Sequence, residues 1–309
     1  MARKPRALRP GDLVGVVAPA GPVDEERLKL GVAELESLGF AVRVADGVLE
    51  REGFTAGTVE NRLEQLHGFF ADGAVAAIAC ARGGAGTIHL LPRLDLELLR
   101  ENPKPVLGYS DVTLLHLVME GLGIASLHGP MVARELADGD AAYDRASLWH
   151  ALTGEGEPYE TGPDDLMALA EGTAEGVLRG GCLSLLAAAA GTPWAPRGRD
   201  ETILFLEDVD EKPYRIDRML RQLRASGALE GVNGIVFGDM KGCAPAFAED
   251  YRLETVLLEA LEGLEVPIAL GLSSGHTPHP NVTLPLGARA RLECVNGEAR
   301  FGVREAPVA

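Results

Sequence analysis

The order of hydrophobic and polar positions predicts alternating strands and helices through the first half of the chain. Short apolar runs predict a buried strand that ends in a small-residue loop within 13–22, and further strands over 41–44, 75–80 and 106–107. Apolar residues recur at helical spacing over 25–38 and 58–71, which predicts amphipathic helices, and a further helix is expected between Gly86 and Leu91. This alternation is typical of a parallel sheet with helices on both faces, whose ligands bind at the carboxyl ends of the strands.

The second half is richer in strands and predicts an α+β domain with some antiparallel pairing. Strand patterns are expected over 202–208, 234–238, 267–270, 290–294 and 299–303, and helices over 214–223 and 253–261. Between about 133 and 176 the periodicity loosens and Gly, Glu, Asp and Pro cluster. We therefore predict an N-terminal α/β domain over 1–135, a linker region over 136–176 and a C-terminal β-rich domain over 177–309.

Composition narrows the functional classes. The chain has 309 residues, of which 46% are hydrophobic, enough for one large or two medium cores. A net charge of −17 disfavours nucleic acid as a partner. Four widely spaced cysteines match neither a zinc motif nor a secreted disulfide framework, and no apolar run reaches the length of a membrane span. We expect a cytoplasmic protein that binds neither nucleic acid nor membrane.

The stretch 105–117 carries the strongest chemical signal. A short apolar strand runs into Gly108-Tyr109-Ser110-Asp111, and a helical pattern follows at once. That layout is typical of a nucleophile elbow, with the Ser110 Oγ exposed and the Asp111 N–H pointing the same way. Val112 stands where an α/β-hydrolase has glycine, so the motif is not G-x-S-x-G. The alternative is that Ser110 and Asp111 only cap a helix.

A nucleophilic serine needs a base, and the base needs an orienting acid. Among the base candidates, His276 follows a predicted strand in a Gly/Pro-rich loop, whereas His116, His128 and His279 have structural interpretations. His276 and His279 could also form a metal pair, but no third ligand at a telling spacing supports that interpretation.

The candidate acid is Glu207, at the end of a strongly apolar strand, where a buried carboxylate needs a partner. The alternative is that Glu207 or Asp208 caps the next segment or pairs with Arg215 or Arg218.

Gly83 and Gly84 follow the third predicted strand and lie at the same expected sheet edge as Ser110. Glycine lets the backbone approach a ligand closely, so a glycine N–H here and the Asp111 N–H could form an oxyanion hole. The alternative is a phosphate-binding turn, although Arg82-Gly83-Gly84-Ala85-Gly86 matches neither G-x-G-x-x-G nor a Walker A motif.

Taken together, these residues resemble the LD-carboxypeptidase family of serine peptidases, which includes muramoyl-tetrapeptide carboxypeptidases and microcin C self-immunity proteins. The resemblance covers nearly the whole chain. It is carried by Pro10-Gly11-Asp12, Arg82-Gly83-Gly84, Gly108-Tyr109-Ser110-Asp111, His128-Gly129-Pro130-Met131, Leu206-Glu207-Asp208, Tyr214-Arg215-Ile216-Asp217-Arg218 and Gly275-His276 with Asn281-Val282-Thr283. Cys182 departs from the family pattern, which has Asn in the equivalent Gly-Gly-x-Leu, so the role of this position stays open.

The resemblance implies a fold and a mechanism. It implies a flavodoxin-like N-terminal domain, a smaller β-rich C-terminal domain and a homodimer. It also implies Ser110 as nucleophile, His276 as base and Glu207 as orienting acid, with no metal or organic cofactor. The oxyanion hole would be formed by the Asp111 N–H and a glycine N–H from Gly83-Gly84.

The substrate that the resemblance implies is a peptide with a free C-terminal carboxylate. The chain is acidic, so local cations must hold that carboxylate, and Arg82 and Arg215 are the candidates. The leading interpretation is removal of terminal D-Ala from muropeptide tetrapeptides in cell-wall recycling. The alternatives are an immunity-type peptidase acting on a peptidyl or aminoacyl nucleotide, for which Trp149 and Trp194 are possible base platforms, and a non-catalytic binding protein.

Overall fold

The computed structural model describes residues 2–162, 165–245 and 251–309, and the chain separates into two compact units. The N-terminal unit comprises Met1–Glu157, His279–Gly287 and Ala306–Ala309, and the C-terminal unit comprises Pro158–Pro278 and Ala288–Glu305. The predicted division at 135 and 177 stays a prediction; within its linker region the structure places α5 (Arg145–Thr153), β6 (Met167–Ala170) and the start of β7 (Gly172–Cys182).

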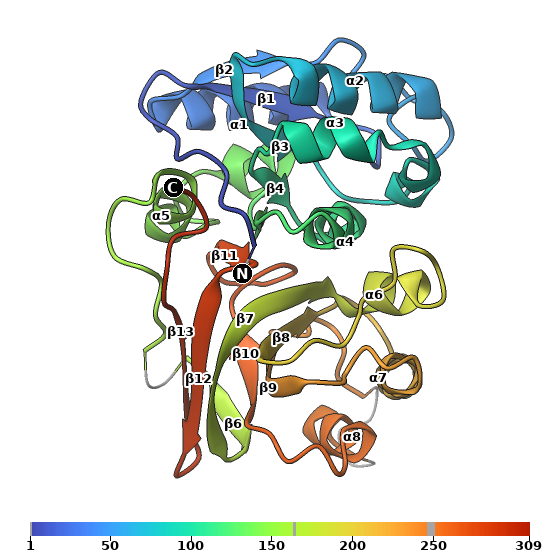
Figure 1. Cartoon of the computed structure of the whole chain (residues 1–309), viewed down its shortest axis with the longest axis vertical. Coiled ribbons are helices and arrows are strands. Elements are labelled where there is room, and N and C mark those ends of the chain that lie inside the picture. Colours follow the sequence, from blue (N-terminus) through green and yellow to red (C-terminus); the bar gives the residue numbers. More distant parts are fainter. Residues whose placement is uncertain (1, 163–164, 246–250) are drawn as a thin grey trace. The chain divides into compact units, whose positions relative to one another are not determined.

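A six-stranded sheet organises the N-terminal unit (Figure 1), with the order β11-β5-β4-β3-β1-β2. Its strands are β1 (Leu13–Val17), β2 (Ala41–Val44), β3 (Val75–Cys80), β4 (Val106–Gly108), β5 (Ser126–His128) and β11 (Leu284–Leu286). The first five strands are parallel, and β11 pairs antiparallel with β5. The parallel order is therefore 2-1-3-4-5, as in doubly wound folds.

Helices connect these strands, and polar caps explain where several begin. They are α1 (Glu25–Ser37), α2 (Val59–Ala71), α3 (Leu96–Glu101), α4 (Thr113–Gly121) and α5, with shorter turns η1 (Thr87–His89), η2 (Leu91–Arg93), η3 (Ser110–Val112) and η4 (Val132–Leu136). Asp24 caps α1 by accepting the N–H of Arg27, and Thr58 caps α2 by accepting that of Asn61.

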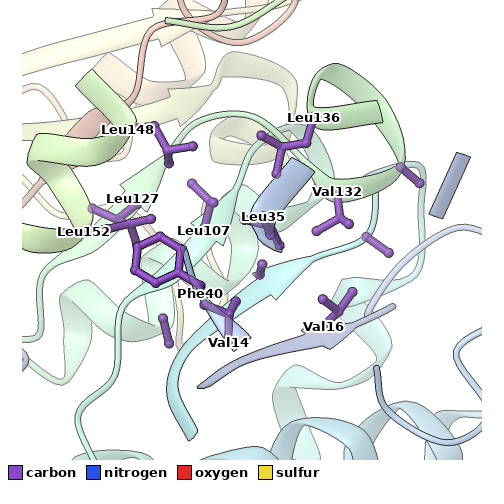
Figure 2. Close-up of a cluster of buried hydrophobic side chains, with 14 of the residues drawn as sticks. Val14, Val16, Leu35, Phe40, Leu107, Leu127, Val132, Leu136, Leu148 and Leu152 are labelled. Carbon is purple, nitrogen blue, oxygen red and sulfur yellow. The ribbon is translucent and has the colours of Figure 1, made fainter. Parts of the chain in front are cut away.

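Both faces of the sheet are covered, as predicted. Val14 and Val16 lie in a buried cluster with residues of α1, η4 and α5, and Figure 2 shows this cluster. On the opposite face of β1, a Cβ added at Gly15 would meet the Phe69 ring of α2 at 2.4 Å, so the helix packs directly on the strand. The predicted buried strand is thus covered on its two sides by different helices.

The prediction of a helix between Gly86 and Leu91 was wrong. The structure has two short 3₁₀ turns there, η1 and η2. Pro92 at the start of η2 cannot donate a backbone hydrogen bond, and Gly86, with a φ of 120°, breaks regularity before Thr87.

A closed barrel organises the C-terminal unit, with the strand order β10-β6-β13-β12-β7-β8-β9 (Figure 1). It consists of β6, β7, β8 (Thr202–Glu207), β9 (Val232–Gly238), β10 (Ile268–Leu272), β12 (Arg289–Val295) and β13 (Glu298–Val303), with helices α6 (Leu183–Ala189), α7 (Pro213–Ala225) and α8 (Leu253–Ala260). Strands β7 to β10 pair in parallel, and β12 and β13 pair antiparallel, so the mixed pairing predicted for this half is present.

Candidate active site

Ser110 occupies the turn between β4 and α4. Its φ is 63°, in the left-handed region that non-glycine residues rarely adopt. Such a residue stores about 1–3 kcal/mol of backbone strain and is found mainly where function requires it. Gly108 leaves room for the turn, because an added Cβ would lie 3.1 Å from side-chain atoms of Cys80 and Val112. The structure thus has the backbone of a nucleophile elbow at the predicted serine.

Gly83 lies against Ser110 within the N-terminal unit. A Cβ added at Gly83 would lie 3.1 Å from the Ser110 Oγ and 3.4 Å from the Asp111 nitrogen. The Gly83 carbonyl accepts the Gly21 N–H at 3.0 Å, which fixes the loop after β3 to the loop after β1. Glycine therefore keeps open a space that borders both the hydroxyl and the neighbouring N–H, where an oxyanion could sit.

The alternative in which Ser110 and Asp111 cap their own helix finds no support in the hydrogen bonds. Within the described chain, neither η3 nor α4 has a side-chain cap. The Asp111 carboxylate instead accepts the N–H of Thr87 at 2.8 Å. The same bond argues against the alternative of a phosphate-binding turn at Gly83–Gly86. The Thr87 N–H, the first of the turn that follows these glycines, already donates to Asp111 and is not open to a phosphate.

His116 and His128 are structural, as expected. His116 is buried and its Nε2 lies 2.8 Å from the Gly108 carbonyl oxygen, a hydrogen bond that supports the elbow. Burial, with the nearby charge of His128, lowers the pKa of His116 to about 3. His128 is also buried, with its ring centroid 5.8 Å from that of Tyr109. A histidine that stays neutral and buried against a carbonyl is a poor general base.

Glu207 and His276 meet within the C-terminal unit. Glu207 ends β8 and is 1% exposed, and its Oε2 accepts the His276 Nδ1–H at 2.8 Å and the His276 backbone N–H at 2.9 Å. A carboxylate bonded to Nδ1 sets the tautomer that leaves Nε2 able to accept a proton. The predicted acid and base are thus placed as a dyad, and the His276 side chain keeps 18% of its surface exposed.

Two glycines make room for the Glu207 side chain. A Cβ at Gly275, whose φ is 86°, would lie 2.5 Å from the Glu207 Cδ, and one at Gly238 would lie 2.8 Å from its Cβ. The close packing restricts the carboxylate to one position. Glycine at position 275 therefore adopts the positive φ of the loop and also leaves the space that lets His276 reach the Glu207 carboxylate.

Sequence reasoning missed the residues that hold the His276 loop. Thr277 donates a hydrogen bond from its Oγ1 to the carboxylate of Asp239, which follows β9. Asp208 accepts the Ser184 N–H at 2.7 Å, in the first turn of α6, which precedes it in the chain, so this bond is not the cap of the next segment that was given as the alternative. The signal for Asp239 was its position directly after a buried strand.

Cys182 lies beside the dyad in the barrel. It pairs with Glu207 in the β7–β8 register, and its Sγ lies 3.3 Å from the Ser184 Oγ. Burial and the charges of Glu207 and Asp208 raise the pKa of the Cys182 thiol well above its ordinary value. The cysteine therefore remains a thiol, which is the weakly nucleophilic form.

The two candidate cations differ in their surroundings. Arg215 is exposed on α7 and its Nη1 lies 3.5 Å from the Glu211 Oε2. Arg82 is half-buried next to Gly83, and its Nη1 donates to the Pro22 carbonyl at 3.0 Å. Burial first, and the positive charges of Arg134 and Arg51 second, lower the pKa of Arg82. Arg82 thus lies in a local concentration of positive charge on the same unit as Ser110.

Other features of the described residues bear on cofactors and membranes. Among them, no three His, Cys, Asp or Glu side chains gather in a way that could hold a metal ion. No helix formed by the described residues is long and apolar enough to cross a bilayer.

The N-terminal unit has a serine in the turn of a nucleophile elbow and the C-terminal unit has a Glu–His pair, the kinds of group that serine peptidases use. Comparison of the sequence with known families agrees: residues 14–129 match the LD-carboxypeptidase N-terminal domain and residues 175–292 match the LD-carboxypeptidase C-terminal domain. The chain belongs to the LD-carboxypeptidase family and is a serine-type carboxypeptidase.

Three similar proteins illustrate the relationship. The "Probable murein peptide carboxypeptidase" of Bacillus subtilis is 38% identical over 99% of this chain and 95% of its own length. The muramoyltetrapeptide carboxypeptidase from Oxalobacter formigenes is 30% identical, covers 96% of this chain and 100% of its own, and superposes with a TM-score of 0.82. An MccF-like protein from Bacillus anthracis is 28% identical over 98% of this chain and 100% of its own, with a TM-score of 0.89.

Proposed function

We propose that this carboxypeptidase removes the terminal D-Ala from muropeptide tetrapeptides by hydrolysing an L,D-peptide bond, as a step of peptidoglycan recycling. The observation that carries the proposal is the left-handed Ser110, held next to the open space at Gly83 and the Asp111 N–H. The tetrapeptide substrate is supported by the names of the relatives that match over the full length of the chain.

The proposed chemistry is acyl transfer through Ser110. His276 takes the proton of the Ser110 hydroxyl, whose oxygen attacks the carbonyl carbon before the terminal D-Ala. The tetrahedral oxyanion is stabilised by the Asp111 N–H and an N–H of Gly83 or Gly84. His276 then protonates the nitrogen of the leaving D-Ala, and water, activated by the same histidine, hydrolyses the acyl-enzyme. The proposal requires His276 of one unit to reach Ser110 of the other.

Glu207 acts through His276. Its hydrogen bond to Nδ1 keeps the imidazole in the tautomer that can accept the serine proton, and its negative charge stabilises the imidazolium that forms. The second hydrogen bond, from the His276 backbone N–H to the same Oε2, restrains the loop as well as the ring.

Arg82 is the stronger candidate for holding the terminal carboxylate. A chain of net charge −17 repels a carboxylate unless cations gather locally. Arg51 and Arg134, whose charges act on Arg82, have exposed side chains that form no ion pair with another described residue. The three arginines lie on separate segments at the carboxyl ends of β1 and β3. Backbone hydrogen bonds link these segments: Ala56 donates to Ala20, Gly21 donates to Gly83 and Ala133 donates to Ala81.

We also propose a fold class for the N-terminal unit, a cellular location and an oligomeric state. The parallel strand order 2-1-3-4-5 supports a flavodoxin-like class for the N-terminal unit. The four cysteines are buried thiols with no disulfide among them, which supports a cytoplasmic location, where thiols stay reduced. The homodimer rests on the family resemblance alone, and sedimentation equilibrium would test it.

The deciding experiment incubates purified protein with the tetrapeptide L-Ala-D-Glu-diaminopimelate-D-Ala and follows the products by mass spectrometry. Wild type and Ser37→Ala, an exposed serine at the end of α1, are expected to release one alanine, and Ser110→Ala is expected to release none. Turnover by Ser110→Ala would overturn the proposed chemistry. A fluorophosphonate probe that labels wild type but not Ser110→Ala would exclude the non-catalytic binding protein.

An aminoacyl-nucleotide substrate is the second candidate, supported by the likeness to the MccF-like protein. An intact tetrapeptide together with cleavage of an aminoacyl sulfamoyl adenosine would replace the leading proposal with this one. Of the two tryptophans that could stack on a base, Trp149 is engaged with Phe40, their ring centroids 5.8 Å apart, in the core of the N-terminal unit. Trp194, half-buried after α6, remains the candidate platform.

A further inference from the structure

A buried carboxylate connects the nucleophile turn to the glycine loop. Asp111 is 4% exposed, and its Oδ2 accepts the backbone N–H of Thr87 at 2.8 Å. The two residues are 24 positions apart and lie on loops that follow different strands, β4 and β3. Because both are buried, this bond is shielded from competing water and fixes the separation of the two loops.

Arg62 of α2 holds the adjacent residue of the same loop. Its side chain is 1% exposed, and its Nη1 donates to the carbonyls of Gly86 at 2.9 Å and Pro19 at 2.8 Å. A Cβ added at Gly86 would lie 2.9 Å from that Nη1, so only glycine allows the guanidinium to approach. Consecutive groups of the loop, the Gly86 carbonyl and the Thr87 N–H, are thus held by a buried cation and a buried anion.

The two charged groups also act on each other. Burial raises the pKa of Asp111, while the nearby Arg62 guanidinium lowers it. Each charge therefore offsets part of the desolvation cost of the other. Burying two charged groups costs more desolvation free energy than burying a neutral hydrogen-bonded pair. This cost argues that the site depends on the position of the loop.

Asp111 contributes to the site twice. Its backbone N–H borders the space kept open at Gly83, 3.4 Å from where a Cβ would lie, and its side chain anchors Thr87 four residues further along that glycine loop. Movement of the loop would change the distance between the Asp111 N–H and the N–H groups of Gly83 and Gly84.

We propose that the Asp111 side chain is a positioning group that sets the spacing of the oxyanion-hole donors, with Arg62 holding the neighbouring carbonyl. The inference rests on the proposed function and adds to it a role for two buried side chains. A positioning group of this kind affects the transition state, where the oxyanion forms, more than the binding of the substrate.

The test compares Asp111→Ala and Asp111→Asn with Asp95→Ala as a matched control. Asp95 accepts the Leu98 N–H at 2.9 Å at the start of α3, so its removal deletes the same kind of bond outside the site. Asp111→Ala is expected to lower kcat for the tetrapeptide roughly 10²-fold with KM changed by less than about threefold. Asp111→Asn keeps an acceptor oxygen but loses the charge, and we expect a loss of about tenfold.

A second measurement separates positioning from general stability. The rate at which a fluorophosphonate modifies Ser110 depends on the same oxyanion donors, so it should fall by a factor close to that for kcat in both Asp111 variants. Asp95→Ala should lower the thermal unfolding temperature while kcat and the labelling rate stay at wild-type values.

The outcomes are distinct. An Asp111 variant that folds and retains wild-type kcat and labelling rate overturns the inference, and so does an equal loss in Asp95→Ala. If Asp111→Ala does not fold, Asp111→Asn decides. If wild type leaves the tetrapeptide intact, the proposed substrate fails, while the labelling rates still test the positioning role.

Discussion

Gly83→Ala is the substitution that most directly probes the proposed oxyanion space. The added methyl would lie 2.8 Å from the Ser110 Cβ, 3.1 Å from its Oγ and 3.4 Å from the Asp111 nitrogen. Ordinary carbon contacts begin near 3.5 Å, so Ser110 must shift by several tenths of an ångström or the methyl must occupy the space meant for the oxyanion. Either outcome impairs the site.

The expected effect falls on catalysis more than on folding. Gly83 is not among the residues with positive φ, so alanine can adopt its backbone conformation. Overpacking at one contact costs about 1–3 kcal/mol of stability. Loss of one oxyanion donor costs about 2.7–4 kcal/mol in the transition state, so we expect kcat to fall between 10²- and 10³-fold.

The assay is steady-state hydrolysis of the tetrapeptide, with thermal unfolding of the same preparations. Gly121→Ala is the matched control, because a Cβ at this exposed position of α4 would have no atom within 4 Å. It should leave kcat unchanged and stabilise the protein by up to about 1 kcal/mol. A folded Gly83→Ala with kcat within threefold of wild type would refute the placement of the oxyanion hole.

Three further predictions follow from the contacts of the site. Glu207→Gln should fold normally but lose about 10⁴-fold in kcat, because an amide neither fixes the tautomer of His276 nor stabilises its charge; a loss below tenfold would contradict the dyad. Arg82→Gln should lower kcat/KM for the free-acid peptide about 10- to 100-fold, as expected for a hydrogen bond to a charged group, and leave a C-terminally amidated peptide unaffected. Arg93→Gln, which breaks an exposed pair with Glu60, is its control, and an equal loss on both peptides would remove Arg82 from the carboxylate site. The lowered pKa of His116 favours the neutral form in the folded state, so its stability contribution is complete above pH 6.5 and is lost as pH falls toward 3. Urea unfolding should show wild type losing about 2 kcal/mol more than His116→Gln between pH 7.5 and pH 5, and equal losses would contradict the assigned cause.

Local patterns predicted the elements whose two ends are both marked in the sequence. Strands β2 and β3 have the predicted bounds, because Gly39 and Gly73 precede them and small or polar residues follow. Helix α2 begins one residue after the predicted start, since Thr58 is its cap rather than its first residue. Strand β11 was not predicted: it has three residues, contains Pro285, and is defined only by its pairing with β5.

The candidate site also has features that the sequence reveals and features that it does not. Glu207 ends a buried strand, and Ser110 and His276 lie within four residues of the end of one, positions that a sequence can reveal. The partner of the Asp111 side chain could not be read from the sequence, because the N–H groups of a nearby helix start and the distant Thr87 N–H are chemically equivalent donors to a carboxylate. Which of them is bonded depends on the spacing of β3 and β4, a tertiary property.

The contacts that support Ser110 and those that support the Glu207–His276 pair each lie within one unit. Ser110 is placed by Gly108, Gly83 and the His116–Gly108 hydrogen bond, and Glu207 and His276 are placed by Gly238, Gly275 and the Thr277–Asp239 bond. Changes to Gly83 or Asp111 should therefore leave the Glu207–His276 hydrogen bond intact, and changes to Glu207 should leave the conformation of Ser110 intact. The motifs that a sequence shows are the reacting groups, while the glycines and buried ions around them decide whether those groups are held in a reactive geometry.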